Sequence, residues 1–330
     1  MVKAKKWILA HHFDGNPKDS DMKLVEETLP ELKDGDVLLE AVYLTVDPYM
    51  RPFSAVALKE GDTMMGTQVA LVKESRNPKF PKGTYVDANV GWRTHTVTSD
   101  ESLLRKFPPF GELPLSYAVG ALGMPGMTAY YGLLEILKPK KGEVILVNGA
   151  AGAVGSLVGQ IAKLKGCKVI AFAGSPEKCK WLKDDLKFDH VFNYKQVKDQ
   201  EKAIREASPD GLDCFFDNVG GESFTAGLRC MKDFGRIAVC GCISSYNDKG
   251  EEKQGPYPNA LINRRQLRVE GFLGWRWMAQ WDEATLEMID WIRQGKLVVK
   301  ESVTEGFDNM RSAFYGLFKG NNIGKAVIKV

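Results

Sequence analysis

Three glycines spaced three residues apart, Gly149, Gly152 and Gly155, are the first group in this sequence that could do chemistry. They lie between a short apolar run, 144–147, and a run at 156–165 whose apolar residues recur at helical spacing. Glycines at such a strand-to-helix turn let backbone N–H groups approach a pyrophosphate at the start of the helix. The pattern therefore indicates a site for a phosphate-bearing ligand.

The residues around this loop favour a dinucleotide site over a plain strand-to-helix turn. The loop departs from the strict G-x-G-x-x-G pattern at Ala150, but a strand precedes it, and an amphipathic helix and a second strand follow it, as dinucleotide-binding motifs require. We expect cofactor contacts from the four residues that end the loop, which are Gly152, Ala153, Val154 and Gly155.

The residues after the second strand indicate which dinucleotide binds. An NAD site has an acidic side chain at the end of that strand, where it holds the ribose 2′-hydroxyl. Here the strand at 168–173 is followed by Gly174 and Ser175, and Lys178 comes soon after. A hydroxyl and an ammonium suit a 2′-phosphate, and Tyr194, after the third strand, is a second candidate contact. The sequence therefore predicts NADP(H), with a surface role as the alternative for Lys178.

Metal ligands are scarce in the N-terminal part of the chain. Residues 1–120 contain no cysteine, and their three histidines are His11, His12 and His95. A catalytic zinc needs about three protein ligands around an open position. We therefore expect no metal, and the reaction must use a substrate that is already electrophilic.

An α,β-unsaturated ketone or aldehyde meets that condition. Hydride transfer from the nicotinamide to the β-carbon produces an enolate, whose oxyanion needs a hydrogen-bond donor. Tyr246 is the leading candidate for this hydroxyl donor, or for orienting the nicotinamide ribose, and Tyr49 is the second candidate. The alternative for each is a half-buried tyrosine whose hydroxyl is satisfied structurally.

Strands and helices alternate from about residue 124, which predicts an α/β fold with a doubly wound parallel sheet. The first part of the chain contains short β-prone runs broken by Gly, Pro and Asp, which predicts a smaller, mostly β domain. After residue 291 short strands return, at 298–299 and 326–330. We expect a discontinuous catalytic domain, 1–123 with 292–330, and a dinucleotide-binding domain at 124–291.

Composition excludes several classes of protein. The formal net charge of the 330 residues is only +3 and the basic residues are scattered, so nucleic acid is not an expected partner. No run reaches the length of about 18 apolar residues that a membrane span needs. The N-terminus does not resemble a signal peptide, and the six cysteines form no C-x-x-C pair. We expect free thiols and a cytoplasmic protein.

Seven segments of the chain resemble the medium-chain dehydrogenase/reductase superfamily, and within it the prostaglandin reductase branch. They run nearly end to end: LTVDPYMR (44–51), MMG (64–66), GMPGMTAY (123–130), the loop and helix at 149–166, FDNVGG (216–221), CGCISSYN (240–247) and NIGK (322–325). The resemblance implies a Rossmann cofactor domain and a GroES-like catalytic domain. One departure is local: the segment 182–189 is one residue longer than in the family and lacks its usual glycine.

The resemblance also implies further cofactor contacts. These are Asn218, the segment Cys240, Gly241, Cys242, Ile243, Ser244, Ser245 and Tyr246, the segment Phe272, Leu273 and Gly274, and Asn322. For Asn218 the alternative is an Asx turn before Gly220 and Gly221. A homodimer is implied as well, with apolar strands near 240–275 as a possible interface.

The implied activity is reduction of 15-oxoprostaglandins at carbon 13 and of alkenals, with oxidation of the leukotriene B4 12-hydroxyl as a further activity. Zinc-free quinone reduction and a non-catalytic NADPH-binding role are the alternatives. A lipid-like enone would suit a lining of flexible and aromatic residues, and Arg51 or Arg276 could meet a carboxylate. The candidate lining residues are Met64, Met65, Met124, Met127, Phe272, Trp275 and Trp277. Core packing is the alternative role for each lining residue, and a structural ion pair is the alternative for each arginine.

Overall fold

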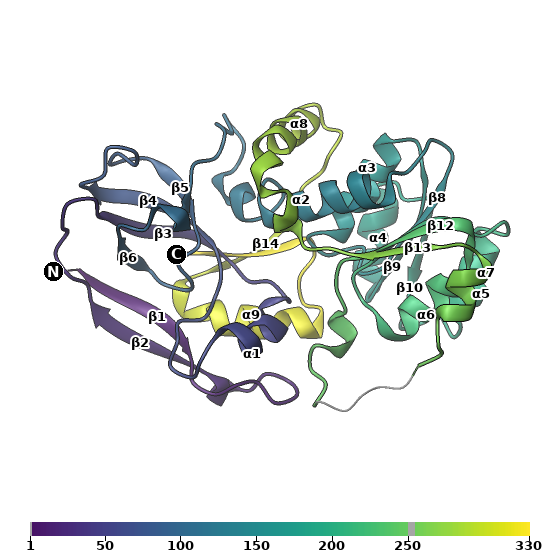
Figure 1. Cartoon of the computed structure of the whole chain (residues 1–330), viewed down its shortest axis with the longest axis horizontal. Coiled ribbons are helices and arrows are strands. Elements are labelled where there is room, and N and C mark those ends of the chain that lie inside the picture. Colours follow the sequence, from purple (N-terminus) through teal and green to yellow (C-terminus); the bar gives the residue numbers. More distant parts are fainter. Residues whose placement is uncertain (1, 250–254) are drawn as a thin grey trace.

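The computed structural model describes residues 2–249 and 255–330, which form two domains side by side (Figure 1). The first domain contains a two-stranded sheet, β1-β2, and a larger sheet in the order β14-β15-β3-β4-β5-β7, with β6 beside β3. Its strands are β1 (Lys3–Leu9), β2 (Met22–Thr28), β3 (Val37–Thr45), β4 (Gln68–Ser75), β5 (Tyr85–Ala88), β6 (His95–Thr98), β7 (Leu104–Arg105), β14 (Glu301–Glu305) and β15 (Lys325–Lys329). Its α-helices are α1 (Met50–Ala57) and α9 (Met310–Lys319).

The second domain is built on a six-stranded sheet in the order β10-β9-β8-β11-β12-β13, and every pairing in it is parallel. Its strands are β8 (Val144–Val147), β9 (Lys168–Ala173), β10 (His190–Asn193), β11 (Leu212–Asp217), β12 (Met231–Val239) and β13 (Arg268–Gly271). Its α-helices are α2 (Met124–Tyr131), α3 (Gly155–Leu164), α4 (Pro176–Asp184), α5 (Gln200–Ala207), α6 (Gly221–Arg229), α7 (Asn259–Arg264) and α8 (Trp281–Arg293). This is the doubly wound order, so the predicted fold class is confirmed.

Short helical turns connect these elements: η1 (Asp19–Asp21), η2 (Glu101–Leu103), η3 (Leu115–Val119), η4 (Gly132–Leu137), η5 (Ile243–Ser245), η6 (Gly274–Gln280) and η7 (Phe307–Asn309). The C-terminal strand β15 pairs antiparallel with β3, and β14 pairs with β15. The last part of the chain therefore completes the sheet that the first part begins. Among the described residues, no helix has the length and apolarity that crossing a membrane demands.

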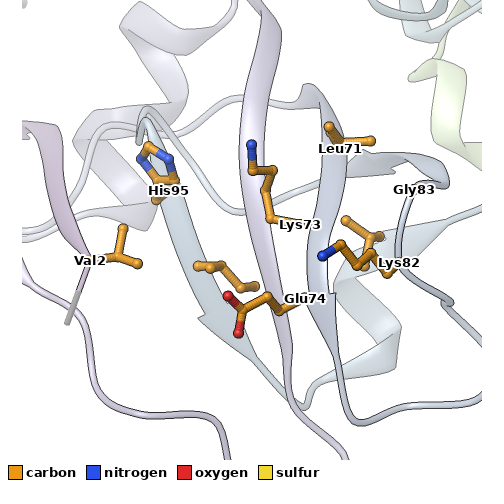
Figure 2. A pocket seen from close by; sticks show the side chains of 9 residues that line it. Val2, Leu71, Lys73, Glu74, Lys82, Gly83 and His95 are labelled. Carbon is orange, nitrogen blue, oxygen red and sulfur yellow. The ribbon is translucent and has the colours of Figure 1, made fainter.

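The outer face of the first domain carries a depression of about 380 Å³, lined by residues of β3, β4 and β6 and of the turn before β5 (Figure 2). Lys73 and His95, on its rim, both approach Glu40, at 3.0 and 3.5 Å. None of the predicted site residues lines it. The depression is therefore separate from the candidate site described below.

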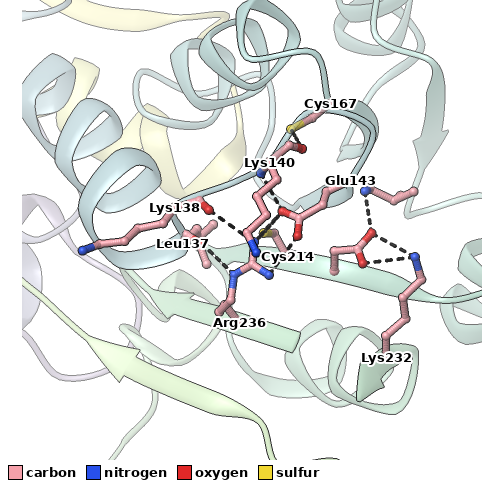
Figure 3. A network of polar contacts seen from close by, with 10 residues as sticks. Leu137, Lys138, Lys140, Glu143, Cys167, Cys214, Lys232 and Arg236 are labelled. Atoms are coloured by element: carbon pink, nitrogen blue, oxygen red, sulfur yellow. Dashed lines mark hydrogen bonds and ion pairs between the residues drawn. The ribbon is translucent and has the colours of Figure 1, made fainter. Parts of the chain in front are cut away.

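The amino ends of the strands β8, β11 and β12 are joined by a network of ion pairs (Figure 3). Arg236 of β12 donates to Glu143, just before β8, at 2.5 and 3.1 Å, and to the carbonyl oxygen of Leu137 at 2.7 Å. Asp213 of β11 accepts from the amide of Val144 and from Lys232. The network therefore connects the three strands at their amino ends, which form the edge of the sheet opposite to their carboxyl ends.

The predicted strand at 298–299 is wrong, because β14 begins at Glu301. The amide of Val298 donates to the Gln160 side-chain oxygen at 2.7 Å, and the Val298 carbonyl accepts from the Gln160 side-chain nitrogen at 3.1 Å. A side chain from α3 thus supplies the hydrogen bonds that a neighbouring strand would have supplied.

The longer segment at 182–189 ends α4 in a turn that usually uses glycine. Lys187 has a φ of +56°, in the left-handed region, and the amides of Leu186 and Phe188 donate to the carbonyls of Trp181 and Leu182. Glycine is the usual residue in the left-handed region, because a β-carbon is strained there. In this segment a lysine adopts that conformation.

Candidate functional site

The glycine loop has the close packing that its sequence predicts. A β-carbon on Gly155 would lie 2.5 Å from the Gly149 carbonyl oxygen and 2.8 Å from the Ala150 α-carbon. Gly149 itself has a φ of +56°. The helix α3 that follows has neither a side-chain cap nor an acidic residue in its first turn. Its first amides are therefore suited to an anion such as a pyrophosphate.

The carboxyl ends of β8 and β11, where the strand order reverses, are joined by polar side chains. Asn148 donates to Asp217 at 2.5 Å, and the Asn218 amide and side chain donate to the Asn148 side chain and carbonyl at 2.6 and 2.8 Å. The Asp217 carboxylate also accepts from the amides of Val219 and Gly220. The Asx turn considered for Asn218 is therefore made by Asp217, and Asn218 is fixed at the edge where ligands bind in such sheets.

The predicted phosphate contacts lie together at the end of β9. The Tyr194 ring lies against Gly174, where a β-carbon would come within 2.9 Å of the ring. Ser175 caps α4 by accepting from the Lys178 amide, and the Lys178 ammonium donates to the Gly320 carbonyl at 2.8 Å. Burial lowers the pKa of Lys178, and the nearby positive charge of Lys195 lowers it further. This clustering of cationic and hydroxyl groups suits a phosphate.

The segment from Cys240 to Tyr246 runs beside the residues that follow β11. The amides of Cys240 and Gly241 donate to the Asp217 carbonyl, at 2.8 and 3.2 Å, and the amide of Ile243 donates to the Asn218 carbonyl at 3.4 Å. Both the amide and the hydroxyl of Ser244 donate to the carbonyl of Val219; the hydroxyl of Ser245 donates to the Cys242 carbonyl. The structure thus brings this segment to the edge that carries Asn218.

Tyr246 is oriented by the segment that precedes it. Its hydroxyl oxygen accepts a hydrogen bond from the Cys242 amide at 3.2 Å and lies against Gly241. Burial raises the pKa of Tyr246 to about 12. The hydroxyl therefore stays protonated at neutral pH, and its own proton is available for another acceptor.

The C-terminal tail reaches the glycine loop. The Gly324 amide donates to the Ala151 carbonyl at 2.8 Å, and Gly324 forms a bridge with Gly152. Asn322 donates to the Gly324 carbonyl at 2.8 Å. The predicted contact Asn322 therefore lies near the loop although it is distant in sequence.

The three residues at 272–274 differ in how accessible they are to a ligand. The Phe272 side chain is buried against Phe216, and Gly274 lies so close to Thr128 that a β-carbon would come within 2.4 Å of its hydroxyl oxygen. The Leu273 side chain is 45% exposed. Only the backbone of this segment and Leu273 remain available to a ligand.

Tyr49 lies at the start of α1, where the two domains meet. Its ring makes edge-to-face contacts with Phe53 of α1 and with Trp275 of η6, at centroid distances of 5.8 and 6.2 Å. Burial raises the pKa of Tyr49 well above its usual value, and the carboxylates of Asp47 and Asp87 add to the effect. Its hydroxyl is therefore protonated as well. Tyr49 thus contacts the second domain through Trp275.

The predicted substrate lining is only partly supported. Met64 and Met127 are fully buried core residues, and Met65 and Met124 are half-buried. Trp275 contacts Tyr49 and Phe53, whereas Trp277 stacks on Tyr131 and packs against Phe272, so the three aromatic residues do not form one cluster.

Both arginines considered for a carboxylate have structural partners. Arg51 is buried and donates to the carbonyls of Phe13 and Gly15. Arg276 pairs with Glu270 at 2.8 Å. Both arginines therefore have the structural role that was the alternative to binding a substrate carboxylate. In the parts of the chain that the structure describes, 2–249 and 255–330, no group of three or more His, Cys, Asp or Glu side chains could hold a metal ion.

Two polar residues of the site were not predicted from the sequence. Asn148 and Asp217 tie the strand ends together, and each is the polar residue at the end of a buried apolar strand. A polar residue at the carboxyl end of a buried parallel strand lies where ligands bind, and this position could have identified both residues from the sequence.

Comparison with known proteins places the whole chain among oxidoreductases. Residues 5–106 match a family model described as the N-terminal domain of oxidoreductase, and residues 153–292 match one described as zinc-binding dehydrogenase. The chain is 54% identical to prostaglandin reductase 1 of Bos taurus over 331 residues, which cover all of both chains. It is 41% identical to the 2-alkenal reductase (NADP(+)-dependent) of Nicotiana tabacum, with 100% of this chain and 98% of that protein covered. The crystal structure of CurA in complex with NADPH from Vibrio vulnificus superposes with a TM-score of 0.91 at 36% identity, covering 99% of each chain.

Proposed function

The chain belongs to the medium-chain dehydrogenase/reductase superfamily, in its prostaglandin reductase branch, and we propose here which of its residues carry the reaction of that branch. It is an NADP(H)-dependent oxidoreductase that reduces the carbon–carbon double bond of α,β-unsaturated ketones and aldehydes. The predictions of family, cofactor and reaction class are thereby confirmed. We divide the chain into a catalytic domain, 1–123 with 292–330, and a cofactor domain, 124–291, a division supported by the pairing of β15 with β3.

The residues at the carboxyl edge of the sheet fit NADPH. Gly152 to Gly155 would hold the pyrophosphate at the uncapped start of α3. Ser175, Lys178 and Tyr194 would hold the 2′-phosphate, and Gly174 leaves no acidic side chain to repel it. Asn218, the segment at 240–246, the backbone at 272–274 and Asn322 would border the remainder of the molecule. When bound, NADPH supplies the hydride that adds to the β-carbon of the substrate.

The orientation of Tyr246 is the observation that carries this assignment. Because the Cys242 amide donates to the Tyr246 oxygen, the hydroxyl proton is free for the substrate carbonyl oxygen or for a ribose hydroxyl. A donor aimed at the oxygen where negative charge develops stabilises the enolate. Tyr49 would approach the substrate from the catalytic domain. A proton added at the α-carbon completes the reduction.

The substrate class, the oligomeric state and the cellular location are also proposals. A lipid enone or alkenal is the substrate class we favour, because Leu273 and Trp275 expose apolar surface beside the cofactor segment. A homodimer is supported by β13, which lies at the edge of the sheet and exposes Val269. Cytoplasmic location is supported by the six cysteines, all of which are free thiols.

The assignment is tested with purified protein, NADPH or NADH, and a panel of a long-chain enone, an alkenal and a quinone, with loss of reduced-nicotinamide absorbance as the readout. We expect turnover of the enone and the alkenal with NADPH. Lys178→Met should raise the KM for NADPH by about 10- to 100-fold, the equivalent of one charged hydrogen bond, and leave the KM for NADH unchanged. Absence of enone turnover with either cofactor would refute the assignment.

A further inference from the structure

Lys325, the first residue of β15, is buried with a side chain that is 3% exposed. Its ammonium lies 3.0 Å from the Asp47 carboxylate and donates to the Thr45 hydroxyl oxygen at 2.8 Å. It also donates to the carbonyls of Val46 and Ala326, at 2.9 and 2.8 Å. The Thr45 hydroxyl donates in turn to Asp47. The ammonium is therefore held in one position by four protein oxygens.

The backbone just before Lys325 contacts the glycine loop of the cofactor domain, and that of Lys325 itself is fixed within the catalytic domain. The residue before it, Gly324, bridges to Gly152, and the amide of Lys325 donates to the Lys300 carbonyl at 3.0 Å. A β-carbon on Gly324 would lie 1.9 Å from that same carbonyl oxygen, so the backbone passes here without room to shift. The main chain at 324–325 is thus fixed independently of the Lys325 side chain.

The partner of that side chain is attached to the catalytic side. The Asp47 carbonyl accepts from the Met50 amide at 3.2 Å, which forms the turn that begins α1. Tyr49 lies within this turn, and its own carbonyl accepts from the Phe53 amide. Displacement of Asp47 would therefore move Tyr49, whereas the glycine loop has its own contacts.

A buried ion pair contributes little to stability by itself, because the loss of hydration of both charges offsets their attraction, and apolar residues of similar size often do as well. What such an ion pair provides is a fixed position of its two side chains relative to each other. We propose that Lys325 is a positioning residue, which acts through Asp47 to hold Tyr49 at a fixed place relative to the cofactor loop. The proposal rests on the proposed function, in which Tyr49 approaches the substrate.

The test compares Lys325→Met and Asp47→Asn with Lys329→Met, a control on the same strand whose lysine is exposed and pairs with Glu305 at 3.3 Å. We expect kcat/KM for the enone to fall by about 10- to 100-fold in the first two variants, the cost of a misplaced group that is distant from the chemistry. The Kd for NADPH, measured by fluorescence titration, should stay within about twofold of wild type in all three, because the backbone at 324–325 keeps its contacts.

A double-mutant cycle with Tyr49→Phe separates positioning from a general structural effect. If Lys325 acts through Tyr49, the losses in kcat from Lys325→Met and Tyr49→Phe will not multiply in the double variant. Multiplying losses, a Lys325→Met enzyme equal to the Lys329→Met control, or a parallel loss of NADPH affinity would each overturn the proposal.

Two further comparisons keep the test decisive. If Lys325→Met does not fold, Asp47→Asn and the neutral pair Lys325→Met/Asp47→Asn take its place in the cycle, since the double variant leaves no unpaired buried charge. A wild-type enzyme that turns over no enone would remove the proposed function and this inference together. A wild-type enzyme that is active while the Lys325 and Asp47 variants match the control removes only the inference.

Discussion

The ring of Tyr194 lies directly against the α-carbon of Gly174: a β-carbon there would come within 2.9 Å of the ring and 3.0 Å of the Tyr194 hydroxyl oxygen. The position at which an NAD site carries an acidic residue is thus empty of any side chain, and an aromatic ring occupies the space beside it. We propose that the preference for the phosphorylated cofactor follows from the absence of the acid together with the presence of this ring.

Gly174→Ala should therefore weaken NADPH binding without weakening the fold. The added methyl group displaces the Tyr194 ring, which is 46% exposed and can move into solvent. We expect the KM for NADPH to rise by about 2- to 10-fold, equivalent to one neutral hydrogen bond, while the KM for NADH stays constant. An equal rise for both cofactors would show that Tyr194 does not contact the 2′-phosphate.

Tyr246→Phe should lower kcat by about 100- to 1000-fold, as loss of an oxyanion donor does, and leave the KM for NADPH within about twofold. The pKa of Tyr246 is raised to about 12 because the side chain is buried, so the hydroxyl keeps its proton below that pH. The kcat of the wild-type enzyme should consequently show no fall due to Tyr246 up to about pH 10.

The control for this variant is Tyr257→Phe, since Tyr257 is 92% exposed and lies just before α7. It should match wild type in kcat at every pH. If Tyr246→Phe and Tyr257→Phe had equal kinetics, Tyr246 would be excluded from the chemistry, while the proposed binding of NADPH would still stand.

Two glycines of the cofactor loop should respond differently to the same methyl group. At Gly155 it would lie 2.5 Å from a carbonyl oxygen and 2.8 Å from an α-carbon, so the backbone must shift; at Gly152 the nearest atom is 3.3 Å away. Gly155→Ala should lower the free energy of unfolding by about 1–3 kcal/mol, the usual cost of overpacking. Gly152→Ala should leave it nearly unchanged, because the Gly149 carbonyl oxygen is the one atom that the methyl group would meet within 4 Å. It should reduce affinity for NADPH, because the methyl group would take up space beside the proposed pyrophosphate contacts.

Thermal unfolding without cofactor and a fluorescence titration with NADPH measure the two effects separately. Destabilisation by Gly152→Ala as large as that by Gly155→Ala would mean that both glycines serve packing alone.

The sequence was sufficient for the parts of the fold that depend on local pattern. The strands β8 and β9 have the bounds that their apolar runs predict, because strands buried on both faces of a parallel sheet must be apolar throughout. The closeness of Lys178 and Tyr194, the proposed phosphate contacts, was predictable for a related reason, since chain order alone places them after neighbouring strands.

Features that depend on tertiary contacts could not be predicted. Neither the hydrogen bonds from Gln160 that replace a strand at Val298 nor the pairing of Trp275 with Tyr49 across the domains has a local signature. Methionine is compatible with both a core and a binding surface, so the burial of Met64 depended on its neighbours.

The ion pair between Glu143 and Arg236 should make stability depend on pH in the acid range (Figure 3). Burial on its own would raise the pKa of Glu143, but hydrogen bonds from Arg236 and from the Lys140 amide lower it overall. A carboxyl whose pKa is lower in the folded state stabilises the fold fully above its unfolded pKa of about 4.3, and this contribution is lost as the pH falls through the folded pKa.

Glu143→Gln should therefore lower the free energy of unfolding by about 1.5–3 kcal/mol at neutral pH, the contribution of a charged hydrogen bond, since Arg236 would keep its charge without a carboxylate partner. The difference between variant and wild type should be constant between about pH 6 and pH 8 and should shrink below about pH 4, where the wild-type carboxyl takes up a proton. Urea unfolding at several pH values measures it. A difference that persists undiminished at low pH would show that the shape of the Glu143 side chain, and not its charge, stabilises this edge of the sheet.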